Sequence, residues 1–152
     1  MSVIFSRQCE YALQAVLYLA LKPAESMTSI KDLSRTLKIP YHFLGKILQD
    51  LTRKGLLRSL KGPAGGFALK RSPGSITVLE IVVAIDGDGM FNRCVLGFPE
   101  CSGKTPCAIH KRWGGLRSGL YAMLATKSIA ELAGGMDKAA YVLARKKSII
   151  RE

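Results

Sequence analysis

Apolar residues in the first half of the chain recur at the spacing of buried helix faces. They are dense over residues 7–21, where they predict a helix that ends before Pro23. Ser29 opens the sequence Ser-Ile-Lys-Asp, which has the pattern of a capping box and predicts that a short second helix follows. We therefore expect two helices joined by a short connection.

A third helix and a hairpin are predicted next. The helix begins near Pro40, which suits a first turn, and ends at Gly55, which suits a C-cap. Its buried face follows the spacing i, i+3, i+4 and i+7, with Leu44, Ile47, Leu48 and Leu51. Residues 56–60 and 67–69 have the composition of short strands around a glycine-rich tip at 61–66. Helix, turn, helix and hairpin is the order of a winged helix-turn-helix.

Further helices are predicted in the second half. Residues 77–80 form a capping box and open a helix that runs to about Ile85. A long helix resumes at 105–106, where a threonine N-cap precedes a first-turn proline, so Cys107 is expected in its first turn. Residues 128–131 form a capping box for a short last helix. The long helix carries an apolar stripe that predicts a dimer seam: Leu116, Leu120, Met123 and Leu124.

These elements indicate a mainly α-helical fold with a small β-hairpin wing, in four segments. We expect a winged helix-turn-helix over 1–85, a cysteine-rich loop over 86–111, a region with a long dimerisation helix over 112–134, and a basic tail over 135–152. The loop is rich in glycine and proline and holds three of the four cysteines. Trp113 is expected as a core anchor beneath this loop.

The chain is strongly basic, with a net charge of +12 over 152 residues. Such a surface attracts an anionic partner, either nucleic acid or an acidic membrane face. Residues 11–21 form the longest apolar stretch, which is too short to span a bilayer, and no signal-peptide pattern precedes it. We therefore expect a cytoplasmic protein with reduced thiols and no membrane partner. Basic residues without an acidic one follow Leu51: Arg53, Lys54, Arg58, Lys61, Lys70 and Arg71.

The helix that starts at Pro40 is the candidate recognition helix. Groove-reading helices place their N-terminal residues at base edges, which favours the polar residues opposite the leucines. Lys61, at the hairpin tip, is expected in a minor groove, where the negative potential favours cations. The alternative is a solvated basic face. The expected contacts with double-stranded DNA are Ser29, Tyr41, His42, Lys46, Arg58 and Lys61.

Three cysteines and a histidine share the loop and its end. Cys94, Cys101, Cys107 and His110 form the pattern C-x6-C-x5-C-x2-H. Structural zinc sites usually place paired ligands two to four residues apart. The wider gaps suggest thiolates around something larger than one ion, which is how iron–sulfur clusters are held. Reduced structural thiols are the alternative.

The run of residues 39–69, with Lys-Gly-Pro-Ala-Gly-Gly-Phe at 61–67, resembles a family of bacterial regulators. The family contains the iron–sulfur cluster regulator IscR and the nitric-oxide-responsive NsrR. The similarity extends from Ser6 to about Leu132. It implies an N-terminal winged-helix domain with a long dimerisation helix, and a homodimer that binds an operator, which we expect to be palindromic.

The resemblance also implies an iron–sulfur cluster, [2Fe-2S] or [4Fe-4S], on the three loop cysteines, because cluster-bearing members carry three cysteines here. One extra residue lies in the first interval relative to IscR. As fourth ligand, His110 resembles the histidine that follows the last cysteine in IscR. Glu10 lies where some relatives supply a carboxylate from the partner subunit. Cys9 is the third candidate, but a lone cysteine on an apolar helix is more often a small buried hydrophobe.

Three functions follow from these observations. The first is a transcription regulator whose operator affinity depends on the cluster, so that it senses redox state, iron or nitric oxide. The second binds DNA without a cluster and responds to a small molecule, a partner protein, zinc or thiol oxidation. The third is an electron-transfer protein. We expect no enzyme, because the sequence has no nucleotide-binding glycine motif and no nucleophile with a partnered base.

Overall fold

The computed structural model describes residues 4–99, 103–104 and 106–136. The predicted fold class, mainly α-helical with a small β-hairpin, is confirmed. Cys101, Thr105 and nearly all of the expected basic tail lie outside the described residues. The elements are α1 (Arg7–Ala20), α2 (Ile30–Leu37), α3 (Tyr41–Arg53), β1 (Leu57–Leu60), β2 (Gly66–Leu69), η1 (Pro73–Ser75), α4 (Val78–Asp86), η2 (Gly89–Phe91), α5 (His110–Thr126) and α6 (Ile129–Gly134).

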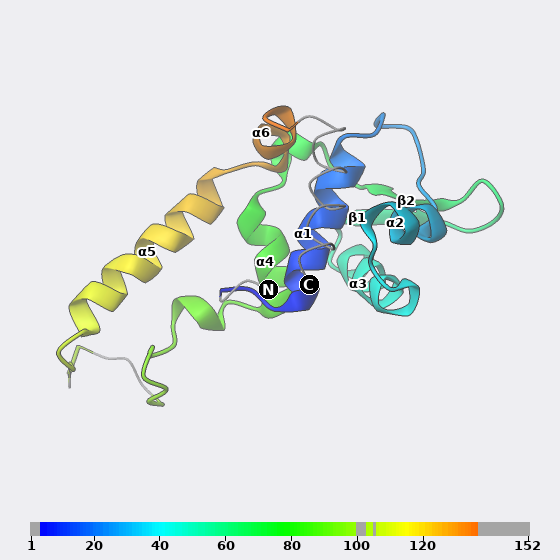
Figure 1. The fold of residues 1–152 in the computed structure, drawn as a ribbon. Coiled ribbons are helices and arrows are strands. Elements are labelled where there is room, and N and C mark those ends of the chain that lie inside the picture. Colours follow the sequence, from blue (N-terminus) through cyan, green and yellow to red (C-terminus); the bar gives the residue numbers. More distant parts are fainter. Residues whose placement is uncertain (1–3, 100–102, 105, 137–152) are drawn as a thin grey trace.

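The body of the molecule is built around α1, with α2, α3, α4 and α6 in contact with it (Figure 1). The apolar faces of these helices meet in one core. The predicted buried face of α3 is confirmed, since its four aliphatic side chains are at most 2% exposed. The core draws a fully buried side chain from each helix of the body: Val16, Leu33, Leu48, Ile81 and Ile129.

Hydroxyl side chains cap several helices, as the sequence predicts. At Thr77 and Ser128 the capping boxes are complete, because the glutamate three residues on also accepts from the backbone N–H of the cap. At Ser29 only half of the predicted box forms. Its Oγ accepts from the N–H of Asp32 at 3.1 Å. The Asp32 carboxylate instead pairs with Arg35 at 2.6 Å and so does not reach back to the cap.

The hairpin follows α3 directly. Gly55 ends the helix as predicted, with a φ of 77° that suits glycine. The two strands pair antiparallel, with Leu57 opposite Leu69 and Leu60 opposite Gly66. The predicted strand limits agree with these within one residue. The hairpin tip extends from the side of the body that carries α2 and α3 (Figure 1).

Helix α5 projects away from the body (Figure 1). It begins at His110 and not at the predicted Thr105-Pro106. The carbonyl of Cys107 accepts from the N–H of His110 at 3.1 Å in a turn, and α-helical bonding begins only with Ile109, whose carbonyl accepts from Trp113 at 2.8 Å. Cys107 therefore precedes the helix, and the expectation that it lies in the first turn is wrong.

Only part of the apolar stripe on α5 reaches the core of the chain. Leu124 is 5% exposed and Leu120 packs partly against the core. By contrast, Leu116 is 67% exposed and Met123 is 54% exposed. Within the described residues, no helix has both the length and the hydropathy needed to cross a bilayer.

Candidate functional site

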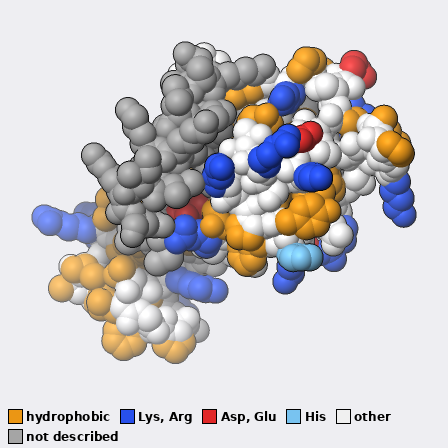
Figure 2. All heavy atoms as spheres, turned by 45° about the vertical axis from the view of Figure 1, so that its right-hand side comes forward, with side chains coloured by type: hydrophobic (Ala, Val, Ile, Leu, Met, Phe, Trp, Pro, Cys, Tyr) orange, Lys and Arg blue, Asp and Glu red, His pale blue; other side chains and the backbone are white. Residues whose placement is uncertain are grey.

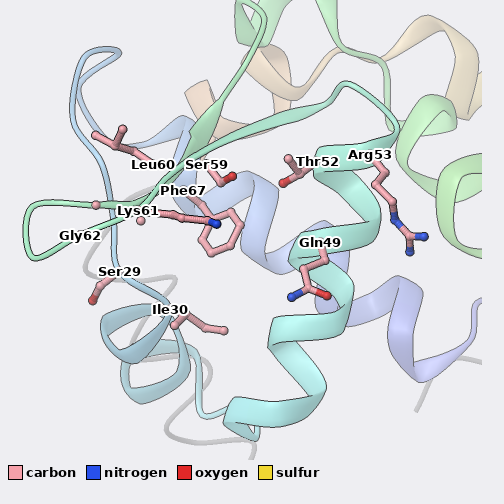
Figure 3. Close-up of a pocket in the computed structure, with 12 residues that line it drawn as sticks. Ser29, Ile30, Gln49, Thr52, Arg53, Ser59, Leu60, Lys61, Gly62 and Phe67 are labelled. Atoms are coloured by element: carbon pink, nitrogen blue, oxygen red, sulfur yellow. The ribbon is translucent and has the colours of Figure 1, made fainter.

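A groove of about 720 Å³ lies between α2, α3 and the hairpin (Figure 3). The start of α2 contributes Ser29, and α3 contributes Gln49 and Arg53. In Figure 3 the side chain of Lys61 reaches from the hairpin toward α3, beside the ring of Phe67. The groove therefore has a basic hairpin on one side and the polar face of a helix on the other.

The backbone just before α2 fixes the position of the hairpin. The Thr28 N–H donates to the carbonyl of Phe67 at 3.0 Å, and the Phe67 N–H donates to the carbonyl of Thr28 at 2.8 Å. The tip also folds tightly on itself, because a Cβ at Gly65 would lie 2.0 Å from the carbonyl oxygen of Leu60. The hairpin and the start of α2 are therefore held together as one unit.

The N-terminal part of α3 presents the expected recognition residues to solvent. Tyr41, His42 and Lys46 are all exposed. The rings of Tyr41 and His42 meet edge to face, with centroids 5.6 Å apart. Gly45 lies where α3 approaches α2, and a Cβ there would lie 3.2 Å from Cδ1 of Ile30. This glycine thus permits close packing of the two helices.

The two expected contacts from the hairpin lie in different hollows. Lys61 lines the groove. Arg58 lines a second hollow of about 580 Å³, together with Lys22 and Lys70, and its Nη2 donates to the carbonyl of Ala24 at 3.4 Å. Basic side chains therefore lie on both sides of the hairpin.

The acidic residues of α2 and α3 are paired with arginines on the same helices. Asp32 bonds to Arg35 at 2.6 Å, and Asp50 bonds to Arg53. Figure 2 shows Lys and Arg side chains spread over the visible face, with few acidic ones among them. Since pairing neutralises these two carboxylates, lysines set the sign of the electrostatic potential around the groove.

Three residues that line the groove were not among the expected DNA contacts: Gln49, Thr52 and Phe67. Helical spacing does place Gln49 opposite the leucines, on the same side as Lys46, although Gln49 was not among the expected DNA contacts. The position of Phe67 depends on its pairing with Thr28, and no local sequence pattern indicates that contact.

Two of the three loop cysteines lie in the described part of the connection between α4 and α5. Cys94 and Cys107 are half-buried, and Cys101 lies outside the described residues. The turn that closes on the Cys107 carbonyl brings Cys107 and His110 next to each other. Among the described residues, no three Cys, His, Asp or Glu side chains come together in a metal-binding arrangement.

The two N-terminal candidates lie in the first turn of α1. Cys9 is fully buried, as predicted for a small hydrophobe. Burial, together with the nearby carboxylates of Asp86 and Glu10, raises the pKa of the thiol to about 12. Cys9 is therefore a protonated thiol in the folded chain. Glu10, the next residue, is half-buried. The α1 terminus is also tied to the last residue of α4, because the Ser6 N–H donates to the Asp86 carboxylate at 2.9 Å.

Residues 5–135 match the model of the Rrf2 family, which is described as an iron-dependent transcriptional regulator. The chain belongs to the Rrf2 family. An HTH-type transcriptional regulator of Aquifex aeolicus is 31% identical over 145 residues, which cover 94% of this chain and 100% of that protein. The HTH-type transcriptional regulator IscR of Xenorhabdus nematophila is 33% identical over 127 residues, 84% of this chain and 77% of that protein.

Solved structures of Rrf2 proteins confirm the winged-helix fold. CymR, the global cysteine regulator of B. subtilis, superposes with a TM-score of 0.78 at 25% identity and covers 90% of this chain and 100% of its own. IscR of T. potens superposes with a TM-score of 0.71 at 22% identity, and the match covers 91% of this chain and 90% of that one. As an Rrf2 transcriptional regulator, the chain binds DNA and is not an enzyme.

Proposed function

We propose that this Rrf2 protein is a cytoplasmic homodimer whose affinity for a palindromic operator is controlled by an iron–sulfur cluster. The position of the cysteine loop carries this proposal. The loop joins α4, which packs in the DNA-binding body, directly to α5, which projects from it. A ligand that orders the loop biases how α5 is held relative to the body, which is the requirement for an allosteric switch. Redox state, iron supply or nitric oxide would be the signal.

In the proposed complex, α3 lies in the major groove of the operator. Its exposed Tyr41, His42 and Lys46 reach base edges, since the N-terminal part of a recognition helix makes these contacts. Gln49, one turn further along, lines the groove between α3 and the hairpin. Its amide offers both a donor and an acceptor to a base or a phosphate.

The surroundings of α3 supply the contacts with the DNA backbone. The Oγ of Ser29 accepts from the Asp32 N–H, which leaves the hydroxyl hydrogen for a phosphate oxygen. Lys61 enters the adjacent minor groove, and Arg58 meets phosphates on the other side of the hairpin. The net charge of +12 supports a strong electrostatic component of binding.

The exposed apolar face of α5 supports the homodimer. Leu116 and Met123, two residues of the apolar stripe on this helix, are 67% and 54% exposed. A second copy of α5 would bury them, because clustered apolar side chains of this size are costly to leave in water. A two-fold axis through this contact would set the recognition helices about one DNA turn apart, roughly 34–36 Å.

The donor chemistry of the loop fits an iron–sulfur cluster. Cys94, Cys101 and Cys107 would supply three thiolates, the ligands that such clusters take. We rank His110 first as fourth ligand, because it shares a turn with Cys107, and Glu10 second, as a ligand from the partner subunit. When bound, the cluster supplies a group that exchanges electrons and reacts with nitric oxide.

A cluster-free regulator of the same fold is the second candidate. It is favoured by the likeness to CymR of B. subtilis, which is described as a global cysteine regulator. In this case a small molecule, a partner protein, zinc or thiol oxidation would be the signal.

Anaerobic purification followed by iron and sulfide analysis separates the two candidates. The cluster-bearing regulator contains iron and acid-labile sulfide in equal amounts and absorbs in the visible range. Cys94→Ala should lose this absorbance, whereas Cys9→Ala, the control at a buried thiol, should keep it. Protein with zinc alone, or with no metal, would establish the cluster-free regulator.

A further inference from the structure

Two side chains of α5 bond to the same carbonyl group in the cysteine loop. The indole Nε1 of Trp113 donates to the carbonyl oxygen of Arg93 at 2.9 Å. Nη1 of Arg117, one helical turn later, donates to the same oxygen at 3.3 Å. Because Arg93 immediately precedes Cys94, these two bonds act on the peptide group that carries the cysteine.

The segment around Cys94 makes further contacts with its surroundings. The rings of Phe91 and Tyr121 meet edge to face, with centroids 5.2 Å apart. The Arg93 N–H donates to the carbonyl of Gly89 at 2.9 Å, and a Cβ at Gly89 would lie 2.9 Å from Nε of Arg93. These contacts keep the segment folded as a tight turn against α5.

Cys94 lines a hollow of about 510 Å³, whose walls include Met90, Trp113, Leu116 and Arg117. Among the described residues, Nε of Arg117 is buried without a hydrogen-bond partner. A buried N–H of this kind is costly unless an acceptor reaches it. A cysteine sulfur, or the sulfur of a cluster bound to it, is an acceptor of the right chemistry in the same hollow.

We propose that Trp113 and Arg117 are positioning residues for Cys94: they hold the Arg93 carbonyl, and thereby fix the cysteine against α5. The role of Cys94 as a cluster ligand rests on the function proposed above. The two hydrogen bonds to the Arg93 carbonyl do not depend on it. Because of these bonds, a displacement of Cys94 would be transmitted to α5, whose exposed face we assign to the partner subunit. Trp113, which the sequence predicts as a core anchor, is instead half-buried outside the core, and its indole N–H contacts the loop.

Alkylation of the cluster-free protein tests the hold. Iodoacetamide is added to the wild type, Trp113→Phe and Arg117→Lys. The rate at which it alkylates the Cys94 thiol is measured by peptide mass spectrometry. Trp113→Phe removes the indole donor and keeps an aromatic ring, and Arg117→Lys removes the guanidinium group that reaches the Arg93 carbonyl and keeps the charge. We expect Cys94 to react about 2- to 10-fold faster in both, the range that one net hydrogen bond represents. Arg112→Lys, an exposed position on the same helix, is the matched control and should leave the rate unchanged.

Internal controls separate a local effect from unfolding. Cys107 should react at its wild-type rate in every variant, and the fully buried Cys9 should stay unlabelled. If labelling of Cys9 shows that one variant has lost its core, the Cys94 rate in the other variant tests the proposal. Rates at Cys94 that are equal to or below wild type in the folded variants would overturn the proposal.

A second readout applies to protein that carries the cluster. Arg117→Lys should change the visible circular dichroism of the cluster, because the hydrogen bonding and the geometry of one ligand change. Arg112→Lys should leave it unchanged, and equal spectra for both variants would contradict the proposal. If the wild type contains no iron or sulfide, the proposed cluster is wrong. The alkylation rates still test whether Trp113 and Arg117 position Cys94.

Discussion

A side chain at Gly66 would collide with the backbone of Thr28. The ideal Cβ position at Gly66 lies 2.2 Å from the carbonyl oxygen of Thr28, and the φ of Gly66 is 145°, a value that L-residues rarely adopt. The hairpin and the start of α2 can therefore approach each other only because this residue is glycine. The groove that we assign to DNA depends on that approach.

Gly66→Ala should therefore destabilise the protein and weaken DNA binding. We expect the free energy of unfolding to fall by about 1–3 kcal/mol, the cost of holding a residue in a disfavoured backbone region, with the collision in addition. Denaturant unfolding measures it. Gly62→Ala is the matched control, because its φ is also positive, 103°, but a Cβ there meets no atom within 4 Å. Equal losses in the two variants would show that the contact with Thr28 has no energetic weight.

Binding to duplex DNA should weaken steeply with salt, and Lys61 should account for part of that dependence. Each phosphate contact contributes about −0.9 to the slope of log affinity against log salt. We expect Lys61→Ala and Arg58→Ala each to flatten the slope by about one unit. Fluorescence anisotropy at several salt concentrations measures both slopes.

Lys127→Ala is the control for this experiment, because Lys127 follows α5 and lies 4.0 Å from the carboxylate of Glu131. It should leave the slope unchanged. A wild-type affinity that does not depend on salt would show that the basic hairpin does not touch DNA. A change in Lys61→Ala alone would place the DNA on the groove side only.

Local patterns were enough to predict the recognition helix. The leucine spacing identifies the buried side of α3, which also identifies the exposed side, and Gly55 marks its end. The groove could not be predicted in the same way. It forms because Thr28 pairs with Phe67 across a long stretch of sequence, and neither residue signals the other.

The start of α5 shows the same limit. Thr105-Pro106 has the pattern of a helix start, yet the helix begins at His110. The contacts that hold this region run from Trp113 and Arg117 to the Arg93 carbonyl, 20 and 24 residues away in sequence. A local pattern contains no information about such contacts, so the position of Cys107 before the helix could not be deduced.

Charge on the exposed face of α5 should produce monomers. Met123→Glu places a carboxylate where we expect the second copy to pack, and Met123 is 54% exposed in the single chain, so the fold should tolerate it. Leu124 is unsuitable for this test because it is 5% exposed and belongs to the core. Light scattering should show a wild-type dimer and a Met123→Glu monomer with weak operator binding. Lys111→Glu, an exposed charge change near the start of α5, should remain dimeric. A monomeric wild type would contradict the dimer.

The fourth ligand is decided by comparing His110→Ala with Glu10→Ala. We expect His110→Ala to change the visible spectrum and leave the cluster fragile, and Glu10→Ala to leave the spectrum unchanged, because His110 shares a turn with Cys107. His42→Ala is the control at the other histidine, and it should weaken DNA binding without affecting the spectrum. The reverse pattern, with a change only in Glu10→Ala, would assign the ligand to the partner subunit.

The central claim is that the cluster controls DNA affinity. Operator fragments are first selected from genomic DNA with the anaerobic protein, and the Kd is then measured before and after a chelator removes the iron. We expect a change of about 10-fold or more, which corresponds to about 1.4 kcal/mol of coupling between the cluster site and the DNA site. A Kd that is the same in the two states, in protein shown to contain iron and sulfide beforehand, would contradict the account.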